Sequence, residues 1–208
     1  MSAAGGSAAR EAAAIRARAR RGVWRRVLAW AGLNPAARRA DARAAAWDVG
    51  AVGEANTAAL LSVLERQGWT VLHDRAIPGA RSANADHVLI SPGALVFLVD
   101  SKFWSARGLV REVRGTLWHG QRNTDKDVRN VRFEADLASR ALGVPVQPLI
   151  AVHNAPVDHD GIIVRDVPVV PAARLVELLR ANDGPRQAGA AWLGELAARC
   201  LPPYSGGT

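Results

Sequence analysis

The sequence contains a single cysteine, Cys200, among its 208 residues. One thiol excludes an internal disulfide and a cysteine-based zinc cluster, and it favours a reducing, cytoplasmic location. Long apolar stretches are also missing. The longest uninterrupted one covers residues 94–99, far short of the ~20 residues that a membrane-spanning helix needs. Because the N-terminus has no signal-peptide pattern either, we expect a cytoplasmic protein without a transmembrane segment.

Lysine is nearly as scarce as cysteine. Lys102 and Lys126 are the only lysines among 27 basic residues. A GC-rich coding bias would explain the excess of alanine and arginine, but it gives no reason for the two positions that keep a lysine. Arginine stays protonated in proteins, whereas an amine is able to release its proton. A retained lysine is therefore a hint that an amine is required at that position.

Positive charge is concentrated near the N-terminus. Residues 1–45 hold ten arginines against two acidic residues, whereas the rest of the chain holds 17 basic and 17 acidic residues. We predict a basic, partly disordered arm with a short amphipathic helix (1–45), a folded domain (46–182), and a C-terminal helix with a tail (183–208). The amphipathic helix, residues 23–33, is compatible with packing on the domain, with binding nucleic acid and with lying on a membrane surface.

The apolar patterns predict an α/β protein. A helix is expected from Asp48, as its N-cap, to Gln67. Its apolar stripe is expected to consist of Val49, Val52, Ala59, Leu60, Val63 and Leu64. A second long helix is expected over residues 125–142. Strands are predicted at 69–77, 85–90, 94–102, 109–113, 116–120, 146–154, 161–164 and 167–170, and terminal helices at 172–180 and 188–201. This order predicts a mixed central β-sheet flanked by helices.

The predicted hairpin around the Ser91-Pro92-Gly93 turn carries the candidate chemistry. A turn there places Asp86 opposite either Val99 or Asp100. In the second register the two carboxylates are direct cross-strand neighbours, with Cβ atoms roughly 4.5–5.5 Å apart. Because side chains alternate along a strand, Lys102 shares the face of Asp100. The hairpin thus brings two carboxylates and an ammonium group together where a buried strand ends.

Two carboxylates at that distance repel each other, and a divalent cation between them relieves the repulsion. Hard oxygen ligands suit Mg²⁺ or Mn²⁺. Beside such a metal, Lys102 would orient an attacking water or help to deprotonate it. The alternative is an ordinary ion pair of Asp100 with Lys102 at a strand end, worth about 0–1 kcal/mol when exposed.

Three short motifs carry a family resemblance, which covers residues 47–104 well and continues more loosely to about residue 180. They are Gly50-x-x-Gly53-Glu54, Asp86-His87 and Asp100-Ser101-Lys102. The sequence resembles the nuclease-related domain (NERD) family, within the PD-(D/E)XK nuclease superfamily. The resemblance implies a restriction-endonuclease-like core, Mg²⁺ bound through the two aspartates, and phosphodiester cleavage by metal-activated water. It departs at Ala85, where superfamily members often have proline.

Glu54 and His87, two further polar residues of these motifs, are expected to have different roles. Glu54 lies nearly opposite the predicted apolar stripe, so its role as a further metal ligand or catalytic base rests mainly on the resemblance. The small residues beside it would let that side of the helix approach the sheet. His87 alternates onto the face away from Asp86 and is expected to be a packed core histidine.

A run of basic residues follows the last motif and is expected to hold a phosphate backbone near the metal. The candidate nucleic-acid-binding residues are Arg107, Arg111, Arg114, Arg122, Lys126 and Arg129. We therefore expect a metal-dependent nuclease, with Glu54, Asp86, Asp100 and Lys102 as its catalytic residues and DNA as the expected substrate. The sequence leaves open DNA against RNA and endonuclease against exonuclease. The alternatives are a catalytically silent nucleic-acid-binding module and a membrane-surface or partner-docking protein that uses residues 23–33. The oligomeric state is left open.

Overall fold

The computed structural model describes residues 35–80 and 84–205, together with residue 13, and in residues 35–49 it describes the backbone alone. The predicted amphipathic helix at 23–33 lies outside the described residues. Helix α3 runs from Pro35 to Glu65, so it begins 13 residues before the predicted start. Asp48 is an interior residue rather than the N-cap. Proline is favoured in the first turn of a helix because its missing N–H has no helical partner there.

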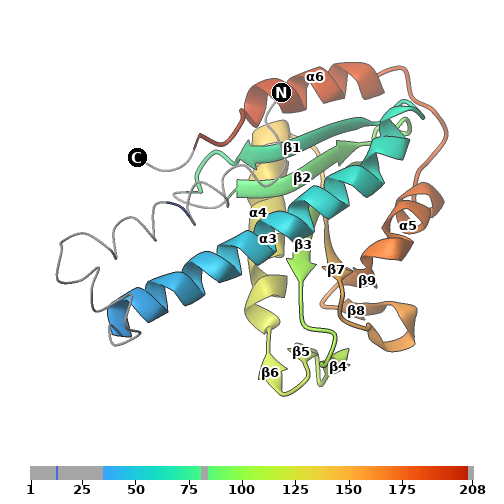
Figure 1. Ribbon diagram of the computed structural model, residues 1–208. Coiled ribbons are helices and arrows are strands. Elements are labelled where there is room, and N and C mark those ends of the chain that lie inside the picture. The colour runs from blue at the N-terminus through green and yellow to red at the C-terminus, as the bar shows by residue number, and fades with distance from the viewer. Residues whose placement is uncertain (1–12, 14–34, 81–83, 206–208) are drawn as a thin grey trace.

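A six-stranded sheet forms the centre of the molecule, in the order β1-β2-β3-β7-β9-β8 (Figure 1). The first three strands are antiparallel neighbours, and β3, β7 and β9 are parallel. The strands are β1 (Thr70–Ala76), β2 (Asn84–Ile90), β3 (Val96–Phe103), β7 (Val146–His153), β8 (Ile162–Val164) and β9 (Val167–Pro171). Every one of these strands was predicted, and the expected mixed α/β sheet is confirmed.

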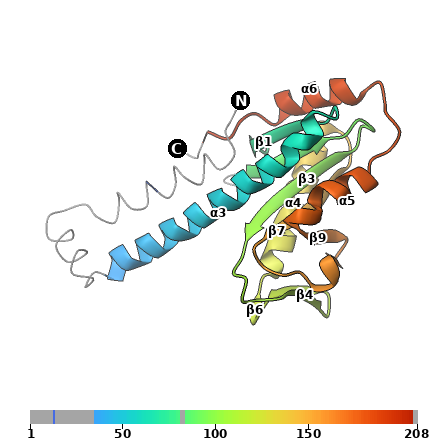
Figure 2. The ribbon, with the colours of Figure 1, turned by 45° about the vertical axis from the view of Figure 1, so that its right-hand side comes forward.

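Helices cover both faces of this sheet (Figures 1 and 2). Helices α3 and α5 (Leu175–Ala181) bury leucines against one face, which we call the α3 face. Helices α4 (Asp125–Leu142) and α6 (Ala190–Cys200) cover the other, which we call the α4 face. The five residues predicted for the buried side of α4, namely Val128, Val131, Ala135, Ala138 and Leu142, are all buried. The apolar periodicity of 3.6 residues therefore placed this helix correctly.

A second, three-stranded antiparallel sheet lies between β3 and α4 in the chain. Its strands are β4 (Val110–Val113), β5 (Thr116–His119) and β6 (Arg122–Asn123). Arg114 and Gly115 form the tight turn between β4 and β5, and both have positive φ, as the predicted strand pair requires. Val110 and Leu117 anchor this small sheet in the core of the α4 face. It extends from the end of β3, which is the end that carries Asp100 and Lys102.

The apolar stripe predicted for α3 is rotated relative to the observed one. Leu64 of the predicted stripe is fully buried, but Val52 and Leu60 are 48% and 37% exposed. Leu61, which was not predicted for the stripe, is fully buried. The buried positions are Gly53, Thr57, Leu61 and Leu64, which follow a helical spacing of three or four residues. Alanine and valine are common on both sides of this helix, so hydrophobicity alone did not identify the side that contacts the sheet.

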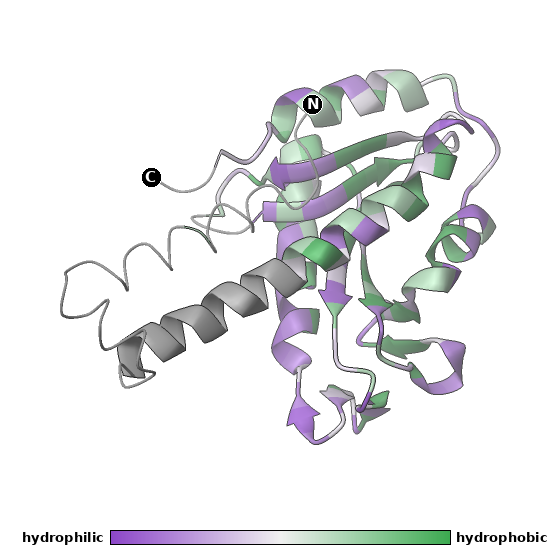
Figure 3. Cartoon of the chain, in the orientation of Figure 1, coloured by the Kyte–Doolittle hydropathy of each residue, from purple (hydrophilic) through white to green (hydrophobic). Residues whose placement is uncertain are grey.

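The apolar strands change character at one end of the sheet. In Figure 3 hydrophilic residues mark the beginning of β2 and the end of β3, while the middle of both strands is hydrophobic. Asp86 lies near the beginning of β2, and Asp100 and Lys102 lie near the end of β3. Since β2 and β3 are antiparallel, these ends are adjacent. Within the described residues, no helix is long and apolar enough to cross a membrane.

Candidate active site

The register of β2 and β3 brings Asp86 and Asp100 together. His87 lies opposite Val99 and Val88 lies opposite Leu98, which is the second of the two predicted registers. One residue further along, this register sets Asp86 across from Asp100. The backbone N–H of Ser101 donates a hydrogen bond of 2.8 Å to Asp86 Oδ2. Val88 and Leu98 belong to the core of the α4 face, so both aspartates lie on that face by strand alternation.

Lys102 completes the group. Its Nζ lies 2.6 Å from Asp100 Oδ1, and the two side chains are 25% and 14% exposed. Burial by itself lowers the pKa of the Lys102 amine, but the carboxylates of Asp100, Asp86 and Asp127 outweigh this effect and raise the pKa above its usual value. Lys102 is therefore an ammonium group in this arrangement. A protonated amine is able to orient a water molecule or a phosphate, but it is no base.

Asp86 is the carboxylate under the strongest electrostatic pressure. Its pKa is raised well above the usual value, first by burial and then by the negative charges of Asp100 and Glu54, against the opposing effects of Lys102 and the Ser101 N–H. The group thus favours keeping one proton or gaining a positive charge. Mg²⁺ and Mn²⁺ take hard oxygen ligands, and Mg²⁺ commonly uses one or two carboxylates with water and substrate phosphate. Asp86 and Asp100 supply the two carboxylates that such an ion needs, so the pair fits Mg²⁺ or Mn²⁺ that takes its other ligands from water and phosphate.

Glu54 reaches this site from α3 because the helix approaches β3 closely at Gly53. A Cβ atom at Gly53 would lie 3.3 Å from the Cβ of Phe103 and 3.5 Å from its backbone nitrogen. Glu54 is half-buried, and its charge is felt at Asp86. The helix therefore approaches the sheet most closely at Gly53 and not at Gly50, where a Cβ atom would meet nothing within 4 Å. The side that carries Glu54 borders the buried one.

The sequence comparisons agree with this geometry. The family model described as the nuclease-related domain matches residues 49–153, from α3 to the end of β7. The chain belongs to the nuclease-related domain family. No curated protein and no solved structure matches the chain. The matched segment contains Glu54, Asp86, Asp100 and Lys102, so the site just described lies inside the nuclease-related domain.

Two acidic residues of the nuclease-related domain were missed by the sequence analysis. Asp127 and Glu134 lie seven residues apart on α4 and therefore on one side of it. Burial raises the pKa of both, and the negative charge of Asp100 raises it further, to about 8 for Glu134. Lys102 opposes both shifts. The seven-residue spacing was visible in the sequence, but nothing in it showed that this side of α4 faces the end of β3.

The Asp86–Asp100 pair is not part of a larger cluster of metal-ligating side chains among the residues whose side chains are described. In residues 50–80 and 84–205, no three His, Cys, Asp or Glu side chains lie close enough together to hold a metal ion. Asp86 and Asp100 therefore stand as a pair, with Glu54, Asp127 and Glu134 contributing charge around it. His87 is fully buried on the α3 face, as predicted for a core histidine.

The predicted nucleic-acid-binding residues lie along the segment between β3 and the first turns of α4. Arg107, Arg114, Arg122, Lys126 and Arg129 are exposed, and Arg111 is half-buried. Arg107 follows β3, Arg111 lies in β4 and Arg114 in the following turn, Arg122 lies in β6, and Lys126 and Arg129 lie in α4. The nuclease-related domain thus presents basic side chains on and beside its small sheet, next to the end of β3.

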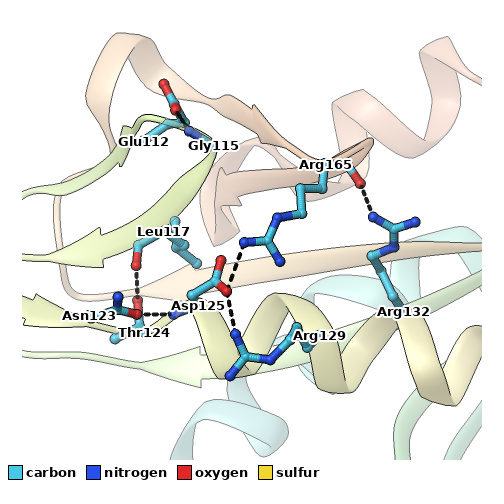
Figure 4. A network of polar contacts seen from close by, with 9 residues as sticks. All are labelled: Glu112, Gly115, Leu117, Asn123, Thr124, Asp125, Arg129, Arg132 and Arg165. Carbon is cyan, nitrogen blue, oxygen red and sulfur yellow. Dashed lines mark hydrogen bonds and ion pairs between the residues drawn. The ribbon is translucent and has the colours of Figure 1, made fainter.

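Arg129 belongs to a separate polar cluster at the start of α4 (Figure 4). Its Nη1 lies 2.5 Å from Asp125 Oδ2, and Arg165 Nη2 lies 2.9 Å from the same oxygen. Arg132 donates a hydrogen bond of 3.0 Å to the backbone carbonyl of Arg165. Arg129 and Asp127 are two residues apart, so they point to nearly opposite sides of the helix. The Asp125 cluster therefore lies on the side of α4 away from Asp127 and Glu134.

Proposed function

We propose that this chain is a metal-dependent nuclease that hydrolyses phosphodiester bonds in DNA. The observation that carries the proposal is the meeting of Asp86, Asp100 and Lys102 at one end of β2 and β3, where a 2.8 Å hydrogen bond and a 2.6 Å ion pair hold them. Membership of the nuclease-related domain family supports it. The reaction class follows from the chemistry of two carboxylates and an ammonium group beside a basic surface.

Asp86 and Asp100 would hold the metal ion, Mg²⁺ or Mn²⁺, and Glu54 would serve as a further ligand or as a base. A bound divalent ion would polarise the scissile phosphate and lower the pKa of a nearby water molecule. The raised pKa of Asp86 supports this assignment, because a cation between the two carboxylates offsets the repulsion and desolvation that raise it.

Lys102 would act through its charge and position. Its ammonium group is fixed by the 2.6 Å contact with Asp100, and it remains the more exposed partner of that ion pair, so other N–H donors remain for a water molecule or a phosphate oxygen. An ammonium group there stabilises negative charge that develops on the phosphate in the transition state. Its retained proton supports orientation of the attacking water rather than deprotonation of it.

A catalytically silent nucleic-acid-binding module is the second candidate. It is favoured by the lack of a three-ligand group in the part of the chain whose side chains are described. This candidate and the nuclease predict different metal dependence. A silent module binds nucleic acid equally well with and without Mg²⁺. It cleaves no nucleic acid, and replacement of Lys102 leaves its binding intact.

The test is cleavage of plasmid and single-stranded DNA with Mg²⁺ or Mn²⁺, compared among the full chain, Asp100→Asn and Lys102→Met. Asp136→Asn is the matched control, because Asp136 is an exposed aspartate of α4. We expect cleavage by the unchanged chain and by the control, and losses of about 100-fold or more in the two site variants. Equal cleavage by all four proteins would mean a contaminating nuclease. Metal-independent binding with no cleavage would favour the silent module.

A further inference from the structure

A continuous chain of hydrogen bonds crosses the α3 face directly behind the carboxylates. His73 and His87 face each other with their Nδ1 atoms 2.8 Å apart, and His87 Nε2 lies 3.2 Å from Ser101 Oγ. The chain continues from Ser101 Oγ to Thr57 Oγ1 over 2.9 Å, and from there to His153 Nε2 over 2.7 Å. These five residues come from β1, β2, β3, α3 and β7 in turn. The chain therefore ties four neighbouring strands to one helix.

The middle of the chain is completely enclosed. Thr57 and His87 have no exposed surface and Ser101 is 6% exposed, while His73 and His153 at the two ends are half-buried. A ring nitrogen of each imidazole in the chain either donates from an N–H or accepts at a bare nitrogen, depending on the tautomer.

Proton counting gives the hydrogen bonds at Ser101 one direction. Ser101 has a single hydroxyl proton, so it cannot donate to both of its partners. It donates to Thr57 Oγ1, so His87 Nε2–H must donate to Ser101, and a neutral His87 then accepts at Nδ1 from His73. The Thr57 oxygen has two lone pairs, so it accepts from Ser101 and can form its bond with His153 in either direction. The Ser101 hydroxyl is therefore held by a donor on one side and an acceptor on the other, which fixes its rotamer.

The chain is coupled to the carboxylates through backbone rather than through side-chain contact. Ser101 is the residue whose N–H donates to Asp86 Oδ2 at 2.8 Å, and it separates Asp100 from Lys102 in β3. Thr57 lies three residues after Glu54, on the same side of α3. Fixing the two hydroxyls against each other therefore fixes the end of β3 relative to the turn of α3 that carries Glu54.

We propose that Thr57 and Ser101 are positioning residues, which, held in line by His87 and His153, set the distance between the Glu54 helix and the Asp86–Asp100 pair. The role in catalysis rests on the proposed nuclease function, whereas the role in holding the Ser101–Asp86 hydrogen bond does not. This positioning role also explains why a histidine, His87, is buried in the Asp86-His87 motif, which packing alone does not explain. A core position filled only for volume would hold an apolar side chain, because buried polar groups destabilise unless they are satisfied.

The test uses two substitutions at Thr57 that differ in one group. Thr57→Val keeps the shape and removes the hydroxyl, and Thr57→Ser keeps the hydroxyl. We expect Thr57→Val to speed hydrogen exchange of the Ser101 amide about tenfold or more, beyond any change in the amides that exchange only by global unfolding. It should also change the imidazole ¹⁵N signals of His87 and His153. Thr57→Ser should leave the exchange rate of the Ser101 amide within about twofold of that in the unchanged chain. It should also leave the imidazole ¹⁵N signals unchanged. Unchanged Ser101 exchange in Thr57→Val, with altered imidazole signals, would overturn the positioning role.

A second variant keeps the test valid if Thr57→Val does not fold. His153→Phe removes the ring nitrogen at the half-buried end of the chain while retaining a ring to stack on Phe103, whose centroid lies 6.3 Å away. It should also speed exchange of the Ser101 amide. An amide protected as in the unchanged chain would contradict the proposal in the same way.

Activity separates this inference from the proposed function. If the unchanged chain cleaves DNA, Thr57→Val should lower kcat roughly tenfold with little change in KM, because misplacement of catalytic groups costs rate rather than substrate binding. Thr57→Ser should restore kcat. If the unchanged chain cleaves nothing, the nuclease function fails, and the exchange and ¹⁵N measurements still decide whether Thr57 and Ser101 position the two segments.

Discussion

The backbone N–H of Ser101 donates a 2.8 Å hydrogen bond to the carboxylate of Asp86. Through this bond the first aspartate of the site is held by the residue that lies between the other two members, Asp100 and Lys102. The bond opposes, without cancelling, the burial and negative charge that raise the pKa of Asp86.

Mg²⁺ is expected to stabilise the protein through Asp86 and Asp100. At a concentration 100 times its dissociation constant, a ligand that binds only the folded state adds about 2.7 kcal/mol to the free energy of unfolding. We expect thermal unfolding followed by circular dichroism to move to a higher temperature with Mg²⁺. Asp100→Asn should abolish the shift and the exposed Asp136→Asn should retain it. An identical shift in both variants would place the ion elsewhere.

Stability should fall as the pH rises because of Glu134. Its pKa is about 8 in the folded protein, raised first by burial and then by Asp100, against an ordinary value of 4.5. Between these values the folded state keeps a proton that the unfolded state has lost, so the free energy of unfolding decreases with pH. Glu134→Gln should remove up to about 3.5 kcal/mol of this decrease between pH 5 and pH 8. Urea unfolding at several pH values measures it.

The control for Glu134 is again Asp136→Asn, on the exposed side of the same helix. It should leave the pH dependence of stability unchanged. Asp86 also has a raised pKa, so part of the decrease should persist in Glu134→Gln. A variant as pH-dependent as the unchanged chain would show that Glu134 is ionised in the folded state.

Gly53 and Gly50 should respond oppositely to alanine. A Cβ at Gly50 meets no atom within 4 Å, whereas one at Gly53 would lie 3.3 Å from the Phe103 Cβ in β3. Alanine gains about 1 kcal/mol over glycine in a helix interior, so Gly50→Ala should stabilise the protein by up to that amount. At Gly53 the crowding against a central strand should outweigh the gain, for a net loss of about 1 kcal/mol. Chemical denaturation compares the two.

Arg129 and Arg199 form a matched pair for DNA binding. Both are in ion pairs with an acidic residue one turn away on their helix, and their side chains are 61% and 62% exposed. If the predicted basic surface holds the phosphate backbone, Arg129→Ala should weaken DNA binding. It should also reduce the slope of log K against the logarithm of the salt concentration by about 1 in magnitude. Arg199→Ala on α6 should change neither. Titrations of labelled DNA at several salt concentrations, with Asp100→Asn as the background, separate binding from cleavage.

Much of the fold was predictable because its signals are local. The strands of the hairpin are apolar runs around a Ser-Pro-Gly turn, and the buried side of α4 follows a clean helical period. The start of α3 was not predictable in the same way, because residues 35–48 are mostly alanine, arginine and aspartate without a clear apolar stripe. Of its sheet-facing side only Leu64 was predicted, because glycine and threonine occupy two of the other buried positions, where a hydrophobic pattern expects valine and leucine.

The sequence by itself determined that Asp100 and Lys102 share one face of a strand, and strand alternation with a short turn left Asp86 only two positions, opposite Val99 or opposite Asp100. The structure has the second register. Only the tertiary structure decided what surrounds them, because those neighbours are distant in the chain. Gly53 brings Glu54 to the end of β3, α4 turns Asp127 and Glu134 toward Lys102, and Thr57 meets Ser101 behind the carboxylates. Each of these contacts joins two elements across a sheet face, and no spacing within a single element encodes which sides will meet.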